Sequence, residues 1–164
     1  MFADLGYSIS GVGKVELDPP GNRYYAGSSV RLTAVPETGW QFMGWRGDIS
    51  GSDPVLNYTV NKETRLTPVF GRTLSIRANT LQGAGTITTI PSGPVYEYNS
   101  LVTLKAEASI VSPSYFIRWS PNDKLGSFNY TQVRIDRFPP PLITGFLAIQ
   151  RAWQTQILFW RPVR

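Results

Sequence analysis

The feature that most constrains this chain is an internal repeat. Residues 11–34 (GVGKVELDPPGNRYYAGSSVRLTA) align without a gap with residues 83–106 (GAGTITTIPSGPVYEYNSLVTLKA), 72 positions later (83 − 11). A repeat at a spacing of this size is typical of structural modules that stack on their neighbours. The 164-residue chain is therefore predicted to hold two modules of about 70 residues each. Their boundaries are predicted at 1–71 and 72–149, with a C-terminal strand or docking tail at 150–164.

Alternation of apolar and polar residues predicts strands throughout both modules. Residues 14–17, 30–34 and 56–60 each alternate, which is the pattern of a half-buried β-strand. Proline and glycine clusters such as residues 19–22 and 36–39 separate these runs and predict turns. The predicted fold is therefore all-β, consisting of two tandem modules and a C-terminal strand.

The alignment can be extended to the ends of each copy. Residues 74–76 (LSI) match residues 7–9 (YSI), 67 positions later (74 − 7), and residues 142–146 can be placed on 66–70, 76 positions later (142 − 66). The junction at residues 71–72 is very short, so the two modules are expected to touch and not to swing on a linker.

Modules of this size need strong packing, and the composition indicates where it comes from. A domain of about 60 residues buries only about 60% of the surface that its unfolded chain exposes. The chain has no Cys and no His, but it has 5 Trp, 8 Tyr and 8 Phe. The missing residue types exclude disulfides and remove the usual ligands of zinc, and we expect no cofactor and no metal. The side chains predicted to fill the cores are apolar and large: Val30, Leu32, Phe42, Trp45, Leu104, Phe116 and Trp119.

Two groups of aromatic residues are candidates for partner contacts. The first group is a possible exposed platform for a glycan or a partner: Tyr24, Tyr25, Trp40 and Tyr58. Flat apolar surfaces of this kind often mark interaction sites, but the same residues would also serve as core or inter-repeat contacts. The second group lies in the apolar tail: Trp153, Phe159 and Trp160. This tail is expected to cover an edge strand of its own chain or to dock on another chain.

Charge and motifs exclude several other classes of function. The net charge is +5, but the basic residues are scattered and form no groove, so nucleic acid is not an expected partner. The acidic residues are spread over turns and strand faces, which does not favour catalysis. The loop at residues 48–53 (DISGSD) lacks the spacing of a calcium-binding EF-hand loop, so its carboxylates are expected to cap turns. There is no run of 18 apolar residues to span a membrane, and residues 1–10 lack the pattern of a signal peptide.

The spacing of glycine and aromatic residues in the first copy resembles a known family. The pattern is G-x-G-x-V, then Y-x-x-G-x-x-V-x-L-T-A, then P-x-x-G-W-x-F-x-G-W-x-G-D and a closing T-x-V-F strand. Residues 7–71 resemble the divergent internalin-type B-repeat of bacterial surface proteins, and residues 73–149 resemble it more distantly. The resemblance implies small β-rich modules, β-sandwich-like or β-grasp-related, that occur in tandem as spacers or adhesive units. It implies no catalytic residues. In the second copy Gly44 is replaced by Arg118, and residues 47–48 (GD) are replaced by residues 121–122 (PN), so the turn after Trp119 is expected to differ.

The sequence thus predicts a non-catalytic structural or protein-interaction module of a bacterial cell-surface or extracellular protein. Protein partners in a larger assembly, or the rest of a surface protein, are the expected contacts. A phage virion or filament component is an alternative, favoured by the absence of an export signal. A carbohydrate-binding module that uses the exposed aromatics is a second alternative.

Overall fold

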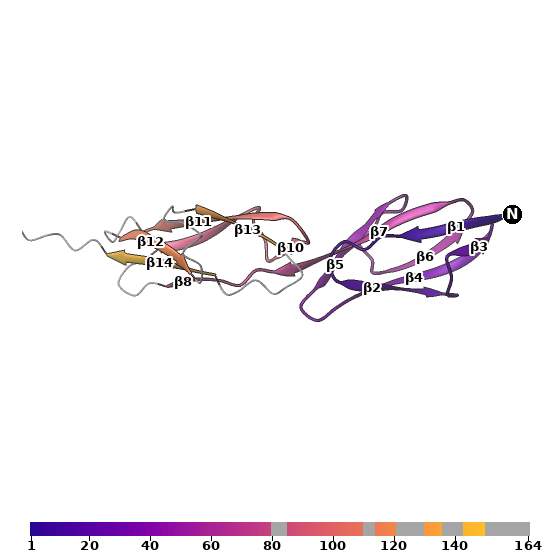
Figure 1. The fold of residues 1–164 in the computed structure, drawn as a ribbon, viewed down its shortest axis with the longest axis horizontal. Coiled ribbons are helices and arrows are strands. Elements are labelled where there is room, and N and C mark those ends of the chain that lie inside the picture. Colours follow the sequence, from indigo (N-terminus) through magenta and orange to yellow (C-terminus); the bar gives the residue numbers. More distant parts are fainter. Residues whose placement is uncertain (80–84, 110–113, 121–129, 136–142, 150–164) are drawn as a thin grey trace, which may run out of the picture.

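The computed structural model describes residues 1–79, 85–109, 114–120, 130–135 and 143–149. No helix occurs among them, and most of these residues lie in β-strands. The predicted all-β class is therefore confirmed. Figure 1 shows two β modules arranged end to end along the longest axis of the molecule.

The first module consists of two facing sheets. Its strands are β1 (Phe2–Tyr7), β2 (Gly13–Asp18), β3 (Arg23–Tyr25), β4 (Ser28–Pro36), β5 (Gln41–Gly47), β6 (Val55–Val60) and β7 (Thr64–Thr73). One sheet is antiparallel in the order β2-β4-β6, and the other has the order β5-β7-β1-β3. Within the second sheet β1 and β7 run parallel, whereas the β5–β7 and β1–β3 pairs are antiparallel.

The core of the first module lies between these two sheets. Strand β4 contributes Val30 and Leu32, which are both fully buried, and the facing sheet contributes Leu5, Trp45 and Phe70. Val30 and Leu32 sit at alternate positions of β4, as expected where one face of a sheet is buried and the other is in water. The alternation in the sequence was therefore a reliable signal for this strand.

A β-bulge in β5 explains how two aromatic residues of opposite parity reach the same core. The register of β5 against β7 shifts between Phe42 and Gly44, so Met43 is the extra residue. A bulge inserts one unpaired residue and re-aims the side chains that follow it. As a result the rings of Phe42 and Trp45 lie on the same side, with their centroids 5.3 Å apart.

The second module repeats this architecture. Its strands are β8 (Ile76–Asn79), β9 (Gly85–Ile90), β10 (Val95–Glu97), β11 (Leu101–Ala108), β12 (Ser114–Ser120), β13 (Tyr130–Arg134) and β14 (Ile143–Ile149). The sheet β13-β11-β9 corresponds to β6-β4-β2, and the sheet β12-β14-β8 corresponds to β5-β7-β1, with β14 and β8 parallel. The register shift between Phe116 and Arg118 falls where the bulge lies in the first module. Such a shared irregularity supports the interpretation of the two modules as copies.

The strand registers correct two parts of the extended alignment. Ile76 pairs with Ile143 as Tyr7 pairs with Leu66, so the opening strand is repeated after 69 residues (76 − 7) and not after 67. The closing strand is repeated after 77 residues (143 − 66) and not after 76. Leu147, and not Phe146, therefore occupies the register position of Phe70. Short apolar and polar runs match each other equally well after a slip of one or two residues, and only pairing decides the register.

Strand β7 belongs to both modules. It closes the first module by pairing with β5 and β1, and its last residues, 71–73, then pair with β10 of the second module. In the first module the start of β1 makes the same antiparallel pairing with β3. One continuous strand therefore joins the two modules, as the short junction predicts. The division at 71/72 remains a prediction, because the shared strand crosses it.

The residues predicted to form the cores lie as follows. Val30, Leu32, Trp45 and Leu104 are buried, and Phe42 is partly buried against the first core. Leu104 belongs to a second cluster of buried residues, together with Val102, Ala106 and Ile135. The side chains of Phe116 and Trp119 lie outside what the structure describes.

Candidate functional site at the module junction

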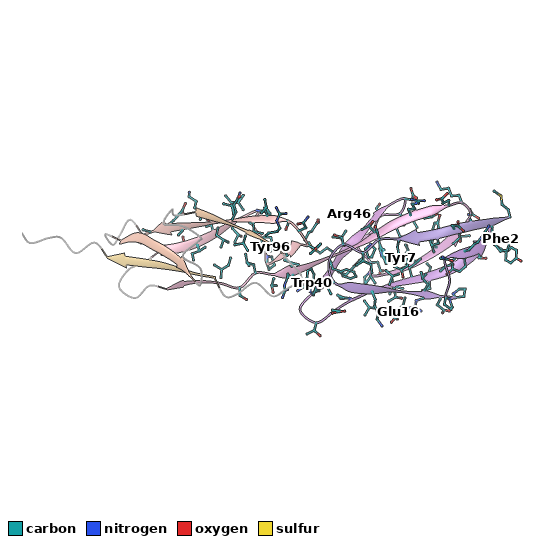
Figure 2. All side chains as sticks on the ribbon, in the orientation of Figure 1. Phe2, Tyr7, Glu16, Trp40, Arg46 and Tyr96 are labelled. Carbon is teal, nitrogen blue, oxygen red and sulfur yellow. The ribbon has the colours of Figure 1, made fainter. Side chains whose placement is uncertain are left out.

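The junction gathers aromatic and charged side chains from both modules, among them Trp40 and Arg46 (Figure 2). Trp40 follows a tight turn in which its N–H donates to the Glu37 carbonyl at 2.9 Å, and the indole is only 7% exposed. The Arg72 guanidinium carbon lies 5.2 Å from the centre of the Trp40 ring, within the range of a cation–π contact. The Tyr98 ring lies on Trp40 with a centroid distance of 6.1 Å. Trp40 is thus covered by Arg72 near the end of β7 and by Tyr98, which follows β10 of the second module.

A bidentate ion pair spans the same junction. Arg46 of β5 donates from Nη1 to Glu97 Oε2 of β10 at 3.0 Å, and from Nη2 to Glu97 Oε1. Two parallel N–H···O bonds fix the orientation of both side chains. The Arg46 side chain is 61% exposed and that of Glu97 is 33% exposed, so water screens the pair and its stabilisation is about 1 kcal/mol or less. The pair therefore contributes more to orientation than to stability.

Gly71 lies where the shared strand passes between the modules. It pairs with Gln41 of β5 on one side and with Glu97 of β10 on the other. A Cβ atom at this position would collide with Met43 Sδ and would lie 2.6 Å from the Tyr96 carbonyl oxygen. The absence of a side chain at Gly71 therefore lets the two modules approach each other directly.

The backbone at the junction repeats a hydrogen bond of the first module. The Tyr98 N–H donates to the Phe70 carbonyl at 3.1 Å, and the Ala26 N–H donates to the Met1 carbonyl at 3.0 Å. Tyr98 and Ala26 are aligned by the 72-residue repeat, and Phe70 and Met1 by the 69-residue register of the opening strand. The junction is therefore built from the same backbone geometry as the N-terminal end of the first module, with different side chains.

The residues of the predicted aromatic platform do not form one exposed surface. Tyr24 is buried, and its hydroxyl donates to the carbonyls of Pro19 and Gly21 at 2.8 and 2.9 Å. Burial raises the pKa of Tyr24, with a smaller contribution from Tyr7.

The other three members of the predicted platform do not form an exposed surface with Tyr24. Tyr58 is partly buried and shares a 3.0 Å hydrogen bond with the Thr64 hydroxyl. Trp40 is buried at the junction, against Arg72. Tyr25 is 65% exposed and stacks on Phe2 with a centroid distance of 4.3 Å. Only Tyr25 thus remains open to solvent as a platform would require. The tail residues Trp153, Phe159 and Trp160 lie outside the described residues.

The carboxylates of the 48–53 loop accept backbone hydrogen bonds. Asp48 Oδ2 accepts from the Arg65 N–H at 2.7 Å, and Asp53 Oδ1 accepts from the Val55 N–H at 2.8 Å. These bonds agree with a turn-capping role for the loop. In the part of the chain that the structure describes, no group of three or more acidic side chains lies close enough to hold a metal ion.

A shallow groove of about 470 Å³ lies beside the β1–β7 pair, and the sequence did not predict it. Its polar lining is largely paired within itself. Ser8 Oγ and Thr67 Oγ1 share a 3.0 Å hydrogen bond, and Arg65 forms an ion pair with Glu63 at 2.9 Å. The remaining lining residues are Asp4, Gly6, Tyr7, Gly47, Thr64 and Leu66. A groove with this lining does not identify a ligand.

Sequence reasoning missed Arg46, Arg72, Glu97 and Tyr98 as junction residues. The signal lay in differences between the copies: Tyr25 is aligned with Glu97, and Ala26 with Tyr98. Both replacements place a new side chain where the second module meets the first. A departure from the repeat at neighbouring positions can thus mark a contact between modules.

The structure thus consists of tandem β modules, and the contacts between side chains of the two modules lie at their junction. None of the described residues forms a helix long and apolar enough to cross a membrane. The family model of the divergent InlB B-repeat domain matches residues 5–74, which covers β1 to β7 except for the first residues of β1. The predicted resemblance is therefore confirmed for the first module. A search of curated proteins and a search of solved structures each gave no match. The family indicates a module of a bacterial surface protein, and its members are generally non-enzymatic.

Proposed function

We propose that this chain is a non-catalytic spacer of a bacterial cell-surface or extracellular protein, and that its two modules keep a fixed mutual orientation. The observation that carries this proposal is the shared strand β7, which closes the first module and pairs with β10 of the second. A spacer has to set the distance between the parts that it connects. A junction made of a paired strand does this, whereas a free linker does not.

Side-chain contacts at the junction support the same function. Neighbouring domains usually move relative to each other unless their interface is extensive. Here the Arg46–Glu97 ion pair and the Trp40 contacts lie around the shared strand and restrict bending and twisting. Each contact is modest, but together they define one orientation. Binding of a protein partner is compatible with this function, and the partner would use surfaces away from the junction.

The proposal is tested by measuring the distance between the modules. The chain has no cysteine, so spin labels can be placed by the double substitution Lys14→Cys and Thr86→Cys. These exposed residues are aligned by the repeat. A fixed junction gives one narrow distance distribution in pulsed electron paramagnetic resonance. A control with a short Gly-Ser insertion after Thr73 should broaden it. A distribution as broad in the parent protein as in the insertion variant would contradict the proposal.

A further inference from the structure

The first and last strands of each module are parallel neighbours. In the first module β1 pairs with β7 through Leu5↔Thr64, Gly6↔Arg65 and Tyr7↔Leu66. In the second module β8 pairs with β14 from Ile76↔Ile143 to Asn79↔Phe146. Both modules therefore present the same arrangement to a force that acts on the two ends of the chain.

In the first module hydrogen bonds extend this parallel pairing beyond the end of β1. The N–H groups of Ser8 and Ser10 donate to the carbonyls of Leu66 and Pro68 at 3.1 and 3.0 Å. The Phe70 N–H donates back to the Ser10 carbonyl at 2.7 Å. The chain from Leu5 to Ser10 is thus hydrogen-bonded along most of β7. We call this pair of bonded segments the terminal-strand clamp.

The direction of the strands determines how the clamp would carry tension. Tension on the chain pulls β1 by its N-terminal end and β7 by its C-terminal end. In a parallel pair these two ends lie at opposite ends of the ladder, so the strands must slide along each other and all the bonds are strained together. In an antiparallel pair the pulled ends would lie side by side, and the bonds would break one after another.

Core packing adds to the resistance against sliding. Leu5 of β1 and Leu66 and Phe70 of β7 are all at most 2% exposed and belong to the same core cluster. Strands β1 and β7 cannot slide past each other without moving these side chains out of their close-packed positions. Hydrogen bonds and core packing of the clamp must therefore fail at the same step.

From this geometry we propose a further function: both modules bear mechanical load along the chain, with the parallel terminal strands as the resisting elements. Strand β7 carries the load from the first module to the second, because it is covalently continuous with the segment that leads into β8. This function goes beyond that of a spacer. A spacer at rest needs only a fixed junction, whereas a load-bearing chain must also stay folded when its ends are pulled apart.

The test is single-molecule force spectroscopy on the full chain in two loading directions. In the first direction the handles are attached at the two ends of the chain. In the second they are attached through the double substitution Lys14→Cys and Glu37→Cys, at the adjacent ends of the antiparallel β2–β4 pair. The Glu37 N–H bonds to the Val12 carbonyl, so this direction opens the pair one bond at a time.

We expect end-to-end loading to give two unfolding events, each releasing roughly 20 nm of chain for a module of about 70 residues. At equal pulling speed, the first module should unfold at a force at least roughly twofold higher end to end than in the second direction. Equal forces in the two directions would overturn the proposal. A narrow distribution of spin-label distances together with equal unfolding forces would support a rigid spacer and refute the load-bearing function. A broad distribution of spin-label distances with a higher end-to-end unfolding force would instead support the load-bearing function and refute the fixed orientation of the proposed spacer.

A variant pair locates the resistance within the clamp. Ser8→Pro removes the N–H that bonds to Leu66 and should lower the end-to-end force, with little effect on the force in the β2–β4 direction. Glu16→Pro on edge strand β2 is the matched control, because it places a proline in a strand outside the clamp, and it should leave the end-to-end force higher than Ser8→Pro does. An equal loss of end-to-end unfolding force in both variants would show that the mechanical resistance depends on the overall stability of the module and not on the clamp. If circular dichroism shows that Ser8→Pro does not fold, the two-direction comparison on the parent sequence decides the proposal.

Discussion

Truncation of Trp45 provides a sharp test of the core. Its side chain is 2% exposed and lies 5.3 Å from Phe42 between ring centroids, and its Nε1–H donates to the Asp53 carbonyl at 2.8 Å. Removing a buried Trp side chain costs about 3–5 kcal/mol. Within this total, the aromatic pair accounts for about 0.5–1.5 kcal/mol, and the unpaired Asp53 carbonyl for about 1–3 kcal/mol if it stays dry.

The expected loss is large relative to the stability of a small module. Folded domains are stable by about 5–15 kcal/mol, and small ones lie near the lower limit. Trp45→Ala should therefore unfold the first module at room temperature or lower its melting temperature strongly. The assay is urea unfolding followed by far-UV circular dichroism. Trp45→Phe keeps an aromatic ring and loses the hydrogen bond, and should cost about half as much or less. A Trp45→Ala protein with the urea midpoint of the parent would show that this side chain does not hold the two sheets together.

Three further predictions concern the junction and the buried tyrosine. Gly71→Ala should destabilise the protein by about 1–3 kcal/mol through overpacking, measured by urea unfolding; an unchanged midpoint would contradict the close approach at this residue. Glu97→Gln should cost at most about 1 kcal/mol, and the difference from the parent should vanish in 1 M salt, where the Debye length is about 3 Å; a cost that persists in high salt would show that the Arg46 pair is not its cause. Because the pKa of Tyr24 is raised above 10.0 in the folded state, its contribution to stability is complete below that pH and is lost as the pH rises through the folded-state pKa. The parent should therefore lose more stability than Tyr24→Phe between pH 9 and the alkaline limit of the assay, and equal slopes would refute this.

Local signals in the sequence predicted most of the architecture. Alternation at Val30, Leu32 and their repeated partners Val102 and Leu104 identified the buried faces, because a strand places every second side chain on one side. The all-β class and the tandem arrangement followed from such patterns. The bulge at Met43 did not follow, although both Phe42 and Trp45 were predicted to be core residues, because strict alternation would place them on opposite faces.

The candidate site was harder to predict because it is nonlocal. Arg46 and Glu97 are 51 residues apart in the chain, and both fall at positions that the repeat pattern leaves unspecified. Their contact depends on the register of β7 against β5 and β10, which a sequence without pairing information leaves open to slips of one or two residues. The same uncertainty misplaced the opening and closing strands of the second copy. Trp40 was predicted to contact a glycan or a partner, or else to lie in the core or between the repeats, and its burial by Arg72 and Tyr98 becomes evident only from the junction.

Comparison of the two register-equivalent ends shows why the junction is specific. Phe2 and Gly71 occupy the same position of the opening strand, opposite Tyr25 and Glu97 respectively. At the first position Phe2 stacks on the exposed Tyr25 ring, whereas at the second any side chain would collide with Met43 and the Tyr96 carbonyl. The backbone of the repeat is therefore the same at both ends, and only a few side chains distinguish the face that meets the second module from the face formed by Phe2 and Tyr25. A side chain at residue 71 would collide with Met43 and the Tyr96 carbonyl, and Glu97 holds Arg46. Exchanging Gly71 for Phe and Glu97 for Tyr should therefore loosen the fixed orientation and also lower the stability of the first module. The spin-label distances and the circular dichroism of that double variant separate the two effects.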